Sequence, residues 1–253
     1  MNDTNLRPLF CRLGGKQRLV KTIINKMPPH EIYIEPFFGG GAVYWKKEPV
    51  KKEIINDLDS DIMKWLKYIK KHNIDDSKLP KDLSTIKKLS LFYSKKPANK
   101  EQALTKDLIK HCNSFSGRDV RHENDIYNNS NPYNKLKNID KYKERLKNTI
   151  ILNEDYIKVI KKYDNKKSLF FLDPPYENSV LYTDTGYAQT AIDYEKMADT
   201  LKSLKGKFIL TINDSKNMRR IFKNFNIKKI KITSTGKQGY GSQERDELII
   251  TNY

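Results

Sequence analysis

Cysteine is scarce in this sequence and long apolar runs are absent, and both facts narrow what the protein can be. Among 253 residues only Cys11 and Cys112 are cysteines, without CxxC or Cys/His spacing, so we expect neither a disulfide framework nor a metal site. No stretch approaches the roughly 18 apolar residues of a membrane helix, and residues 1–10 lack the apolar core of a signal peptide. These absences predict a soluble, intracellular protein without a membrane partner.

Two common nucleotide-binding patterns are missing as well. The glycines of "PFFGGG" fit neither GxGxxG nor GxxxxGK[ST], so dinucleotides and nucleoside triphosphates are poorly supported as ligands. Acidic residues are in the minority, because 49 Lys and Arg face 31 Asp and Glu and give a net charge of +18. Such an excess favours a polyanionic partner. An AT-rich coding sequence, indicated by abundant Lys, Asn and Ile, is an alternative source of part of the charge.

The apolar residues that are present recur as strand-like runs separated by helical patterns. A helical pattern in residues 16–27 ends at Pro28 and Pro29. Strand-like runs follow in "EIYIE", "KKEIIN", "TIIL", "SLFFL" and "KFILTIN", and a glycine turn with a new helix is expected after the first of them. Strands that alternate with helices predict an α/β fold with a mostly parallel sheet. Residues 226–253 predict an antiparallel closing hairpin.

Residues 75–148 have a different character. They combine Lys-rich helical stretches with a segment rich in Asn and Ser, and they carry no buried strand signal. We therefore expect a basic, helical insertion at residues 75–148 within one domain that comprises residues 1–74 and 149–253.

Four acidic residues stand at the ends of predicted strands or directly after them: Glu35, Asp57, Asp155 and Asp173. The carboxyl ends of parallel strands lie at one edge of a sheet, and ligands of open α/β sheets bind there. These carboxylates are therefore expected to face one crevice. Asp57 stands where an acid can accept hydrogen bonds from ribose hydroxyls; a helix cap or a solvated acid is the alternative.

The stretch "LFFLDPPY" ends a strand with an acid, two prolines and an aromatic residue. The exocyclic amine of adenine or cytosine is a poor nucleophile, because its lone pair is delocalised into the ring. Asp173 and the carbonyl of Pro174 can accept hydrogen bonds from the two N–H groups of this amine. The lone pair of the nitrogen is then free to attack an electrophilic methyl group. Tyr176 can stack on the base, which contributes about 1–3 kcal/mol, once the base is flipped out of the duplex. A strand end followed by a proline turn is the alternative.

The chain resembles the DNA adenine methyltransferase (Dam) family of S-adenosylmethionine-dependent N6-adenine enzymes in "LGGKQRLV", "IEPFFGGGAVYW", "INDLDSDI", "FLDPPY" and "ELIITNY". The resemblance implies a Rossmann-like methyltransferase domain in which the basic insertion is the target-recognition region. It implies that S-adenosylmethionine is bound by Gly14, Gly15, Lys16, Glu35, Phe37, Gly39, Gly41, Asp57, Asp155 and Tyr156. It implies a catalytic pocket made of Asp173, Pro174, Pro175 and Tyr176.

The chain departs from the family pattern in two places. It has "RLGGK" where the family has Trp-Ala-Gly-Gly-Lys, and "NSFSGRDVRHEN" where the family has Asn-Gly-Leu-x-Arg. Recognition of GATC is therefore not expected to carry over. The candidates for reading a guanine edge or meeting phosphates are Asn113, Arg118, Arg121, Lys135 and Lys137.

Together these patterns predict a site-specific methyltransferase that transfers a methyl group from S-adenosylmethionine to adenine N6 in double-stranded DNA. A restriction endonuclease counterpart is a possible partner, and a bacterium, phage or large DNA virus is a plausible source. Three alternatives remain open on the sequence: methylation of cytosine N4, methylation of adenine in RNA, and a catalytically silent DNA-binding protein on the same scaffold.

Overall fold

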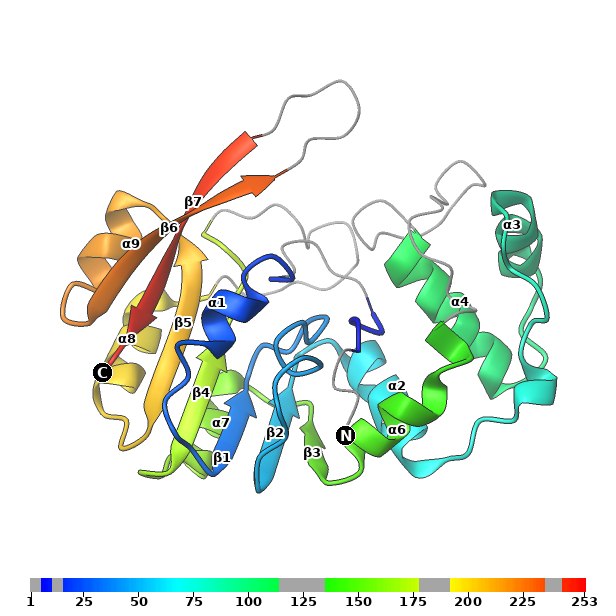
Figure 1. Cartoon of the computed structure of the whole chain (residues 1–253), viewed down its shortest axis with the longest axis horizontal. Helices are drawn as coiled ribbons and strands as arrows, with labels where there is room; N and C mark the ends of the chain where they lie inside the picture. The colour runs from blue at the N-terminus through cyan, green and yellow to red at the C-terminus, as the bar shows by residue number, and fades with distance from the viewer. Residues whose placement is uncertain (1–5, 11–15, 114–134, 178–191, 235–242) are drawn as a thin grey trace.

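The computed structural model describes residues 6–10, 16–113, 135–177, 192–234 and 243–253, whose strands form one sheet in the order β3-β2-β1-β4-β5-β7-β6. The bounds are β1 Ile32–Glu35, β2 Lys52–Asn56, β3 Thr149–Leu152, β4 Ser168–Leu172, β5 Lys207–Asn213, β6 Asn226–Ser234 and β7 Gln243–Thr251. Strands β3, β2, β1, β4 and β5 run parallel, whereas β7 is antiparallel to β5 and β6. The predicted fold, a mostly parallel α/β sheet with an antiparallel closing hairpin, is confirmed (Figure 1).

Helices cover both faces of the sheet: α1 Val20–Ile24 and α2 Ser60–Lys71 on one, and α7 Tyr156–Tyr163, α8 Tyr194–Lys202 and α9 Lys216–Ile221 on the other. Successive strand residues point to opposite faces, so a strand between two helical layers is apolar on both. On β1, Tyr33 joins the core cluster of the first layer and Ile34 that of the second. The strand order reverses between β1 and β4, which is where ligands of such sheets bind.

Residues 75–148 contain helices and no strand in the part that the structure describes. The elements are a 3-10 turn η1 Asp76–Lys78 and the helices α3 Ile86–Ser94, α4 Lys100–Asn113 and α6 Ile139–Leu146. Figure 1 shows α3 and α4 at the end of the molecule opposite to β6 and β7. Trp65 and Tyr68 of α2 hold α4 by donating to Asp107 and Glu101. The extent of this region as a separate recognition domain stays a prediction.

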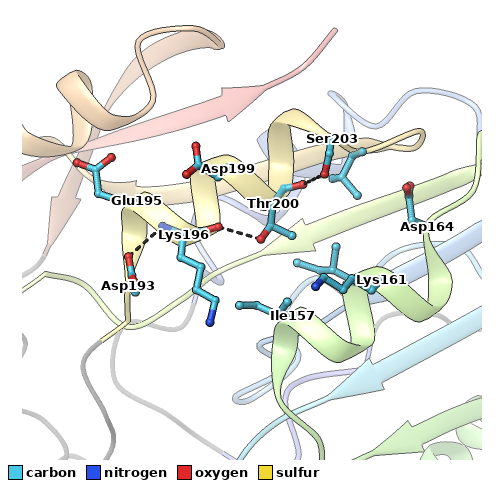
Figure 2. Close-up of a pocket in the computed structure, with 11 residues that line it drawn as sticks. Ile157, Lys161, Asp164, Asp193, Glu195, Lys196, Asp199, Thr200 and Ser203 are labelled. Atoms are coloured by element: carbon cyan, nitrogen blue, oxygen red, sulfur yellow. Dashed lines mark hydrogen bonds between the residues drawn. The ribbon is translucent and has the colours of Figure 1, made fainter.

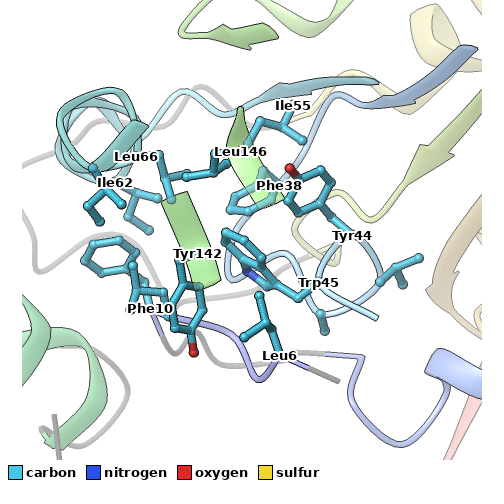
Figure 3. Close-up of a cluster of buried hydrophobic side chains, with 14 of the residues drawn as sticks. Leu6, Phe10, Phe38, Tyr44, Trp45, Ile55, Ile62, Leu66, Tyr142 and Leu146 are labelled. Atoms are coloured by element: carbon cyan, nitrogen blue, oxygen red, sulfur yellow. The ribbon is translucent and has the colours of Figure 1, made fainter. Parts of the chain in front are cut away.

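Helix α6 packs into the main core. Tyr142 and Leu146 belong to the same apolar cluster as Trp45, and the rings of Tyr142 and Trp45 meet edge to face with centroids 5.1 Å apart (Figure 3). The hydroxyl of Tyr142 also donates to the carbonyl of Arg7 at 3.0 Å. This helix therefore joins the end of residues 75–148 to the segment that follows the glycine turn.

The prediction of a helix after "EIYIE" is wrong, because residues 39–47 form turns. Gly41 has a φ of 68°, and a Cβ there would lie 2.2 Å from the ring of Phe38. Isolated helical bonds form, such as the one from the N–H of Trp45 to the carbonyl of Gly41 at 3.0 Å. The side chains of Tyr44 and Trp45 are fully buried, so tertiary packing prevails over local helical preference.

A buried ion network connects α6 to β2 and to the turn after the glycines. The guanidinium of Arg145 donates to both oxygens of Glu53 and, at 2.9 Å, to the carbonyl of Tyr44. Lys47 pairs with the same Glu53 carboxylate, and the side chains of Arg145 and Glu53 are only 6% and 5% exposed. Since a charge removed from water needs a partner, each member of this network depends on the others.

Arg145→Met should lower the free energy of unfolding by about 3 kcal/mol, because it leaves the buried Glu53 carboxylate with Lys47 alone. Urea unfolding measures the change. Arg220→Met is the matched control, since Arg220 pairs with Glu195 at the surface, where ion pairs contribute little. Equal stability losses in the two variants would contradict a structural role for the buried network.

Candidate active site

The "DPPY" motif lies directly after β4, as its sequence context predicts. One oxygen of Asp173, Oδ1, binds two donors: the ammonium of Lys16 at 2.7 Å and the hydroxyl of Thr211 on β5 at 2.9 Å. Within the described part of the chain, neither Oδ2 of Asp173 nor the carbonyl of Pro174 receives a hydrogen bond. Among the described residues, these two acceptors of the "DPPY" motif are therefore available to a ligand that carries N–H groups.

Two tyrosines fix the rest of the motif. The hydroxyl of Tyr194 on α8 donates to the carbonyl of Pro175. The hydroxyl of Tyr176 donates to Glu247 on β7 and accepts from Lys16 Nζ at 2.8 Å. The same Nζ lies 4.7 Å from the centroid of the Tyr176 ring. The position of the Tyr176 ring is thus tied to a buried cation and a buried acid.

The contacts of three residues in this cluster were not predicted from the sequence. The resemblance assigns Lys16 to the cofactor, which stays a prediction; in the structure its ammonium binds Asp173 of the "DPPY" motif, and its side chain is only 4% exposed. Thr211 and Glu247 were not identified from the sequence. Only the pairing of the strands could have identified them: β5 and β7 are antiparallel neighbours in which Asn213 pairs with Glu247. A single sequence does not reveal that register.

Glu35 ends β1 with a buried side chain, and its carboxylate accepts a hydrogen bond from the hydroxyl of Tyr33 at 2.7 Å. Burial is the main reason that the pKa of Glu35 rises to about 8. The negative charge of Asp173 acts in the same direction, and the hydrogen bond from Tyr33 opposes both. The acids that end β1 and β4 are therefore close enough to influence each other.

Asp57 follows β2 and holds the glycine turn. Its carboxylate accepts a hydrogen bond at 2.6 Å from the N–H of Gly39, whose φ is 50°. The amide of the preceding Asn56 donates to the carbonyls of Pro36 and Glu154 at 3.0 and 2.9 Å. The segments that follow β1, β2 and β3 are thereby bound to one another at the carboxyl edge of the sheet.

Asp155 and Tyr156 begin α7. The Asp155 carboxylate caps the helix by accepting from the N–H groups of Ile157 and Lys158 at 3.0 and 3.3 Å. The ring of Tyr156 packs on Phe37 with centroids 4.9 Å apart, and burial raises the pKa of Tyr156 to about 12. The two rings form an aromatic wall beside the segment that follows β1.

The remaining predicted site residues divide into those the structure describes and those it does not. Outside the described residues lie Gly14, Gly15, Arg118 and Arg121. Asn113 ends α4, and Lys137, just before α6, is exposed. The ammonium of Lys135 donates to the carbonyl of Leu9 at 2.9 Å, so the protein's own backbone already binds this cation.

The described residues outside this cluster offer no second candidate active site. A groove of 720 Å³ lies between α7 and α8 (Figure 2), but none of the strand-end residues lines it. Its acids already serve the fold, since Asp193 caps α8 and Asp199 pairs with Lys202 at 2.8 Å. No group of three or more His, Cys, Asp or Glu in the described residues is arranged to hold a metal ion. No helix there is long and apolar enough to cross a membrane.

Glu35→Gln should make the protein more stable at pH 8.5 than the wild type, with little difference near pH 5. The unfolded carboxyl ionises above about pH 4.5 while the folded one keeps its proton to about pH 8, so wild-type stability falls as the pH rises through this window. One pKa unit corresponds to about 1.4 kcal/mol, and a gain of a few kcal/mol is the upper limit. Urea unfolding at both pH values measures it, with Glu144→Gln, an exposed residue of α6, as control. Parallel pH dependences of Glu35→Gln and the wild type would refute a buried, protonated Glu35.

Comparison with known proteins connects this geometry to a family. A family model described as "D12 class N6 adenine-specific DNA methyltransferase" matches residues 13–235. Type II methyltransferase M1.LlaDCHI of Lactococcus lactis subsp. cremoris is 27% identical over 286 residues, which cover 100% of this chain and 97% of that protein. Type II methyltransferase M.MjaIII of Methanocaldococcus jannaschii is 26% identical, with 98% of this chain and 99% of that protein covered. Type II methyltransferase M.CviBI of Paramecium bursaria Chlorella virus NC1A is 22% identical, with 86% of each covered.

These matches confirm the resemblance carried by "IEPFFGGGAVYW" and "FLDPPY", and they favour adenine in DNA over the cytosine and RNA alternatives. The family model spans most of the chain, including the strand ends described above. The protein belongs to the D12 class of N6 adenine-specific DNA methyltransferases.

Proposed function

We propose that this DNA methyltransferase binds S-adenosylmethionine at the ends of β1, β2 and β3 and methylates an adenine that is flipped out of double-stranded DNA. The pocket for the base is formed by Asp173, Pro174, Pro175 and Tyr176. The observation that carries the proposal is the Lys16 ammonium bound to Asp173, because it supports a role for this carboxylate as an acceptor for nitrogen-bound protons just after a strand end.

The residues at the first three strand ends fit the cofactor's chemistry. S-adenosylmethionine carries a sulfonium and an ammonium, for which the carboxylates of Glu35 and Asp57 are suitable partners. The aromatic wall of Phe37 and Tyr156 suits its adenine. The raised pKa of Glu35 also fits, since an arriving cation would restore the ionised form. When bound, the cofactor supplies an electrophilic methyl group.

The catalytic motif activates the target amine. Oδ2 of Asp173, which has no donor among the described residues, and the carbonyl of Pro174 accept hydrogen bonds from the two N–H groups of adenine N6. These bonds direct the nitrogen lone pair away from the ring. This lone pair would then attack the methyl group that bound S-adenosylmethionine would supply, and the electron pair of the broken carbon–sulfur bond would stay on sulfur. The surplus proton on N6 leaves through the Asp173 carboxylate to water. Tyr176 stacks on the base and offsets part of the cost of flipping it, which is a few kcal/mol.

Residues 75–148 are proposed to recognise the target sequence, with Asn113, Arg118, Arg121, Lys135 and Lys137 as DNA contacts. The net charge of +18 supports binding to a polyanion. The names of the relatives, which call them Type II methyltransferases, support a restriction endonuclease as a counterpart.

Transfer of labelled methyl from S-adenosylmethionine to mixed-sequence double-stranded DNA tests the proposed reaction. Digestion and chromatography should place the label in N6-methyladenine. Label in N4-methylcytosine would change the substrate, and label on RNA alone would change the nucleic acid. Absence of both transfer and cofactor binding would support the catalytically silent alternative.

Asp173→Ala should reduce the single-turnover rate of methyl transfer by at least about 100-fold, because a polar contact made to the reacting group in the transition state is lost. Affinity for DNA, measured by fluorescence anisotropy, should stay within about threefold of the wild type. Asp199→Ala, an exposed residue of α8, is the matched control and should keep the wild-type rate. Substantial residual methylation by Asp173→Ala would reject its proposed function.

Arg118→Ala should relax sequence preference, whereas Lys137→Ala should weaken binding to all sequences alike. An arginine that reads a guanine contributes about 1–3 kcal/mol of discrimination, and a lysine that meets a phosphate contributes mainly to the salt dependence. Competition between target and random DNA at two salt concentrations separates the two effects. Equal losses on both DNAs for Arg118→Ala would rule out base reading by this residue.

A further inference from the structure

Asp173 presents its two oxygens unequally. Oδ1 is bound by the Lys16 ammonium at 2.7 Å and by the Thr211 hydroxyl at 2.9 Å. These donors come from the N-terminal segment and from β5, two parts of the chain that are far apart in sequence. Oδ2 has no donor among the described residues. A carboxylate whose one oxygen is anchored from two directions cannot rotate freely, so the other oxygen keeps a fixed orientation.

Glu247 balances the cation that makes this anchor. Its side chain is 10% exposed, and its Oε2 lies 3.8 Å from Lys16 Nζ, while its Oε1 accepts from the hydroxyl of Tyr176. Lys16 therefore lies between two carboxylates. Without Glu247, the full positive charge of Lys16 would act on Asp173 and weaken its attraction for the N–H groups of a neutral amine. The hydroxyl of Tyr176 would also lose its acceptor.

From these contacts we infer that Thr211 and Glu247 are positioning residues for methyl transfer, which act through Lys16, Asp173 and Tyr176. Thr211 and Lys16 hold Oδ1 of Asp173 so that Oδ2 faces the target amine. Glu247 keeps Lys16 in place and fixes the ring on which the base stacks. This inference rests on the proposed role of Asp173. It assigns a function to the closing strand β7, which otherwise serves only the sheet.

The test compares variants that keep shape and remove one polar function. Thr211→Val and Glu247→Gln should each slow single-turnover methyl transfer by about 10- to 100-fold, because small displacements of a reacting group have effects of this size. Affinities for DNA and for S-adenosylmethionine, measured by anisotropy and calorimetry, should change by less than about threefold. Thr211→Ser restores the hydroxyl and should recover most of the rate.

Two controls separate positioning from general effects on the fold. Thr200→Val removes a half-buried hydroxyl of α8 that donates to the carbonyl of Lys196 at 2.8 Å and, among the described residues, contacts no member of the site. Asp246→Asn alters the residue that precedes Glu247. The Asp246 carboxylate pairs with the exposed Lys229 of β6 at 2.6 Å. Both should keep the wild-type rate, and thermal unfolding checks that all variants are folded. If one site variant fails to fold, the other still decides the question.

The outcomes are distinct. A wild-type rate in folded Thr211→Val and Glu247→Gln, or a Thr211→Ser rate as low as that of Thr211→Val, would overturn the inference. So would a loss that resides in DNA or cofactor affinity. Asp173→Ala is measured beside them: if it retains activity, the proposed function of Asp173 fails first. If it is inactive while the positioning variants are unimpaired, only the present inference fails.

Discussion

The parallel pairing of β1 and β4 is the constraint on which the rest of the site depends. These two strands are far apart in the sequence but adjacent in the sheet, where Ile32 pairs with Ser168 and Ile34 with Phe170. The strand order reverses between them. Chain that leaves β1 therefore turns toward one side and chain that leaves β4 toward the other. Glu35 and Asp173 are consequently brought to neighbouring strand ends from sequence positions far apart.

Two acids at adjacent strand ends create an electrostatic problem, which the protein solves differently for each. Glu35 is buried, and its pKa is raised so that it is largely protonated at neutral pH in the protein alone. Asp173 instead binds the ammonium of Lys16 and the hydroxyl of Thr211. In the proposed function a cationic ligand would replace the proton on Glu35, whereas the partners of Asp173 are covalently part of the chain. One acid is thus suited to respond to a ligand and the other to stay fixed.

Much of this arrangement follows from local sequence patterns. The buried strands that end at Glu35 or just before Asp57 and Asp173 were predictable, because apolar runs and turn residues are local and parallel strands share one carboxyl edge. The turns that replace the helix predicted after the glycines were not predictable, since Tyr44 and Trp45 are buried in the core and long-range packing overrides their local preference. Thr211, Glu247 and the position of Lys16 depend on contacts across 38 to 160 residues, which periodicity does not encode.

Long-range contacts also link the proposed recognition region to the strand ends proposed to bind the cofactor. The chain returns from residues 75–148 through α6, where Arg145 binds Glu53 on β2 and the carbonyl of Tyr44. The hydroxyl of Tyr44 in turn donates to the carbonyl of Arg145 at 2.9 Å. Any displacement of α6 on binding DNA would therefore disturb the segment that follows the glycines, because buried charges do not tolerate separation. Since that segment continues the turn held by Asp57, the proposed recognition region and the proposed cofactor site share one buried set of contacts.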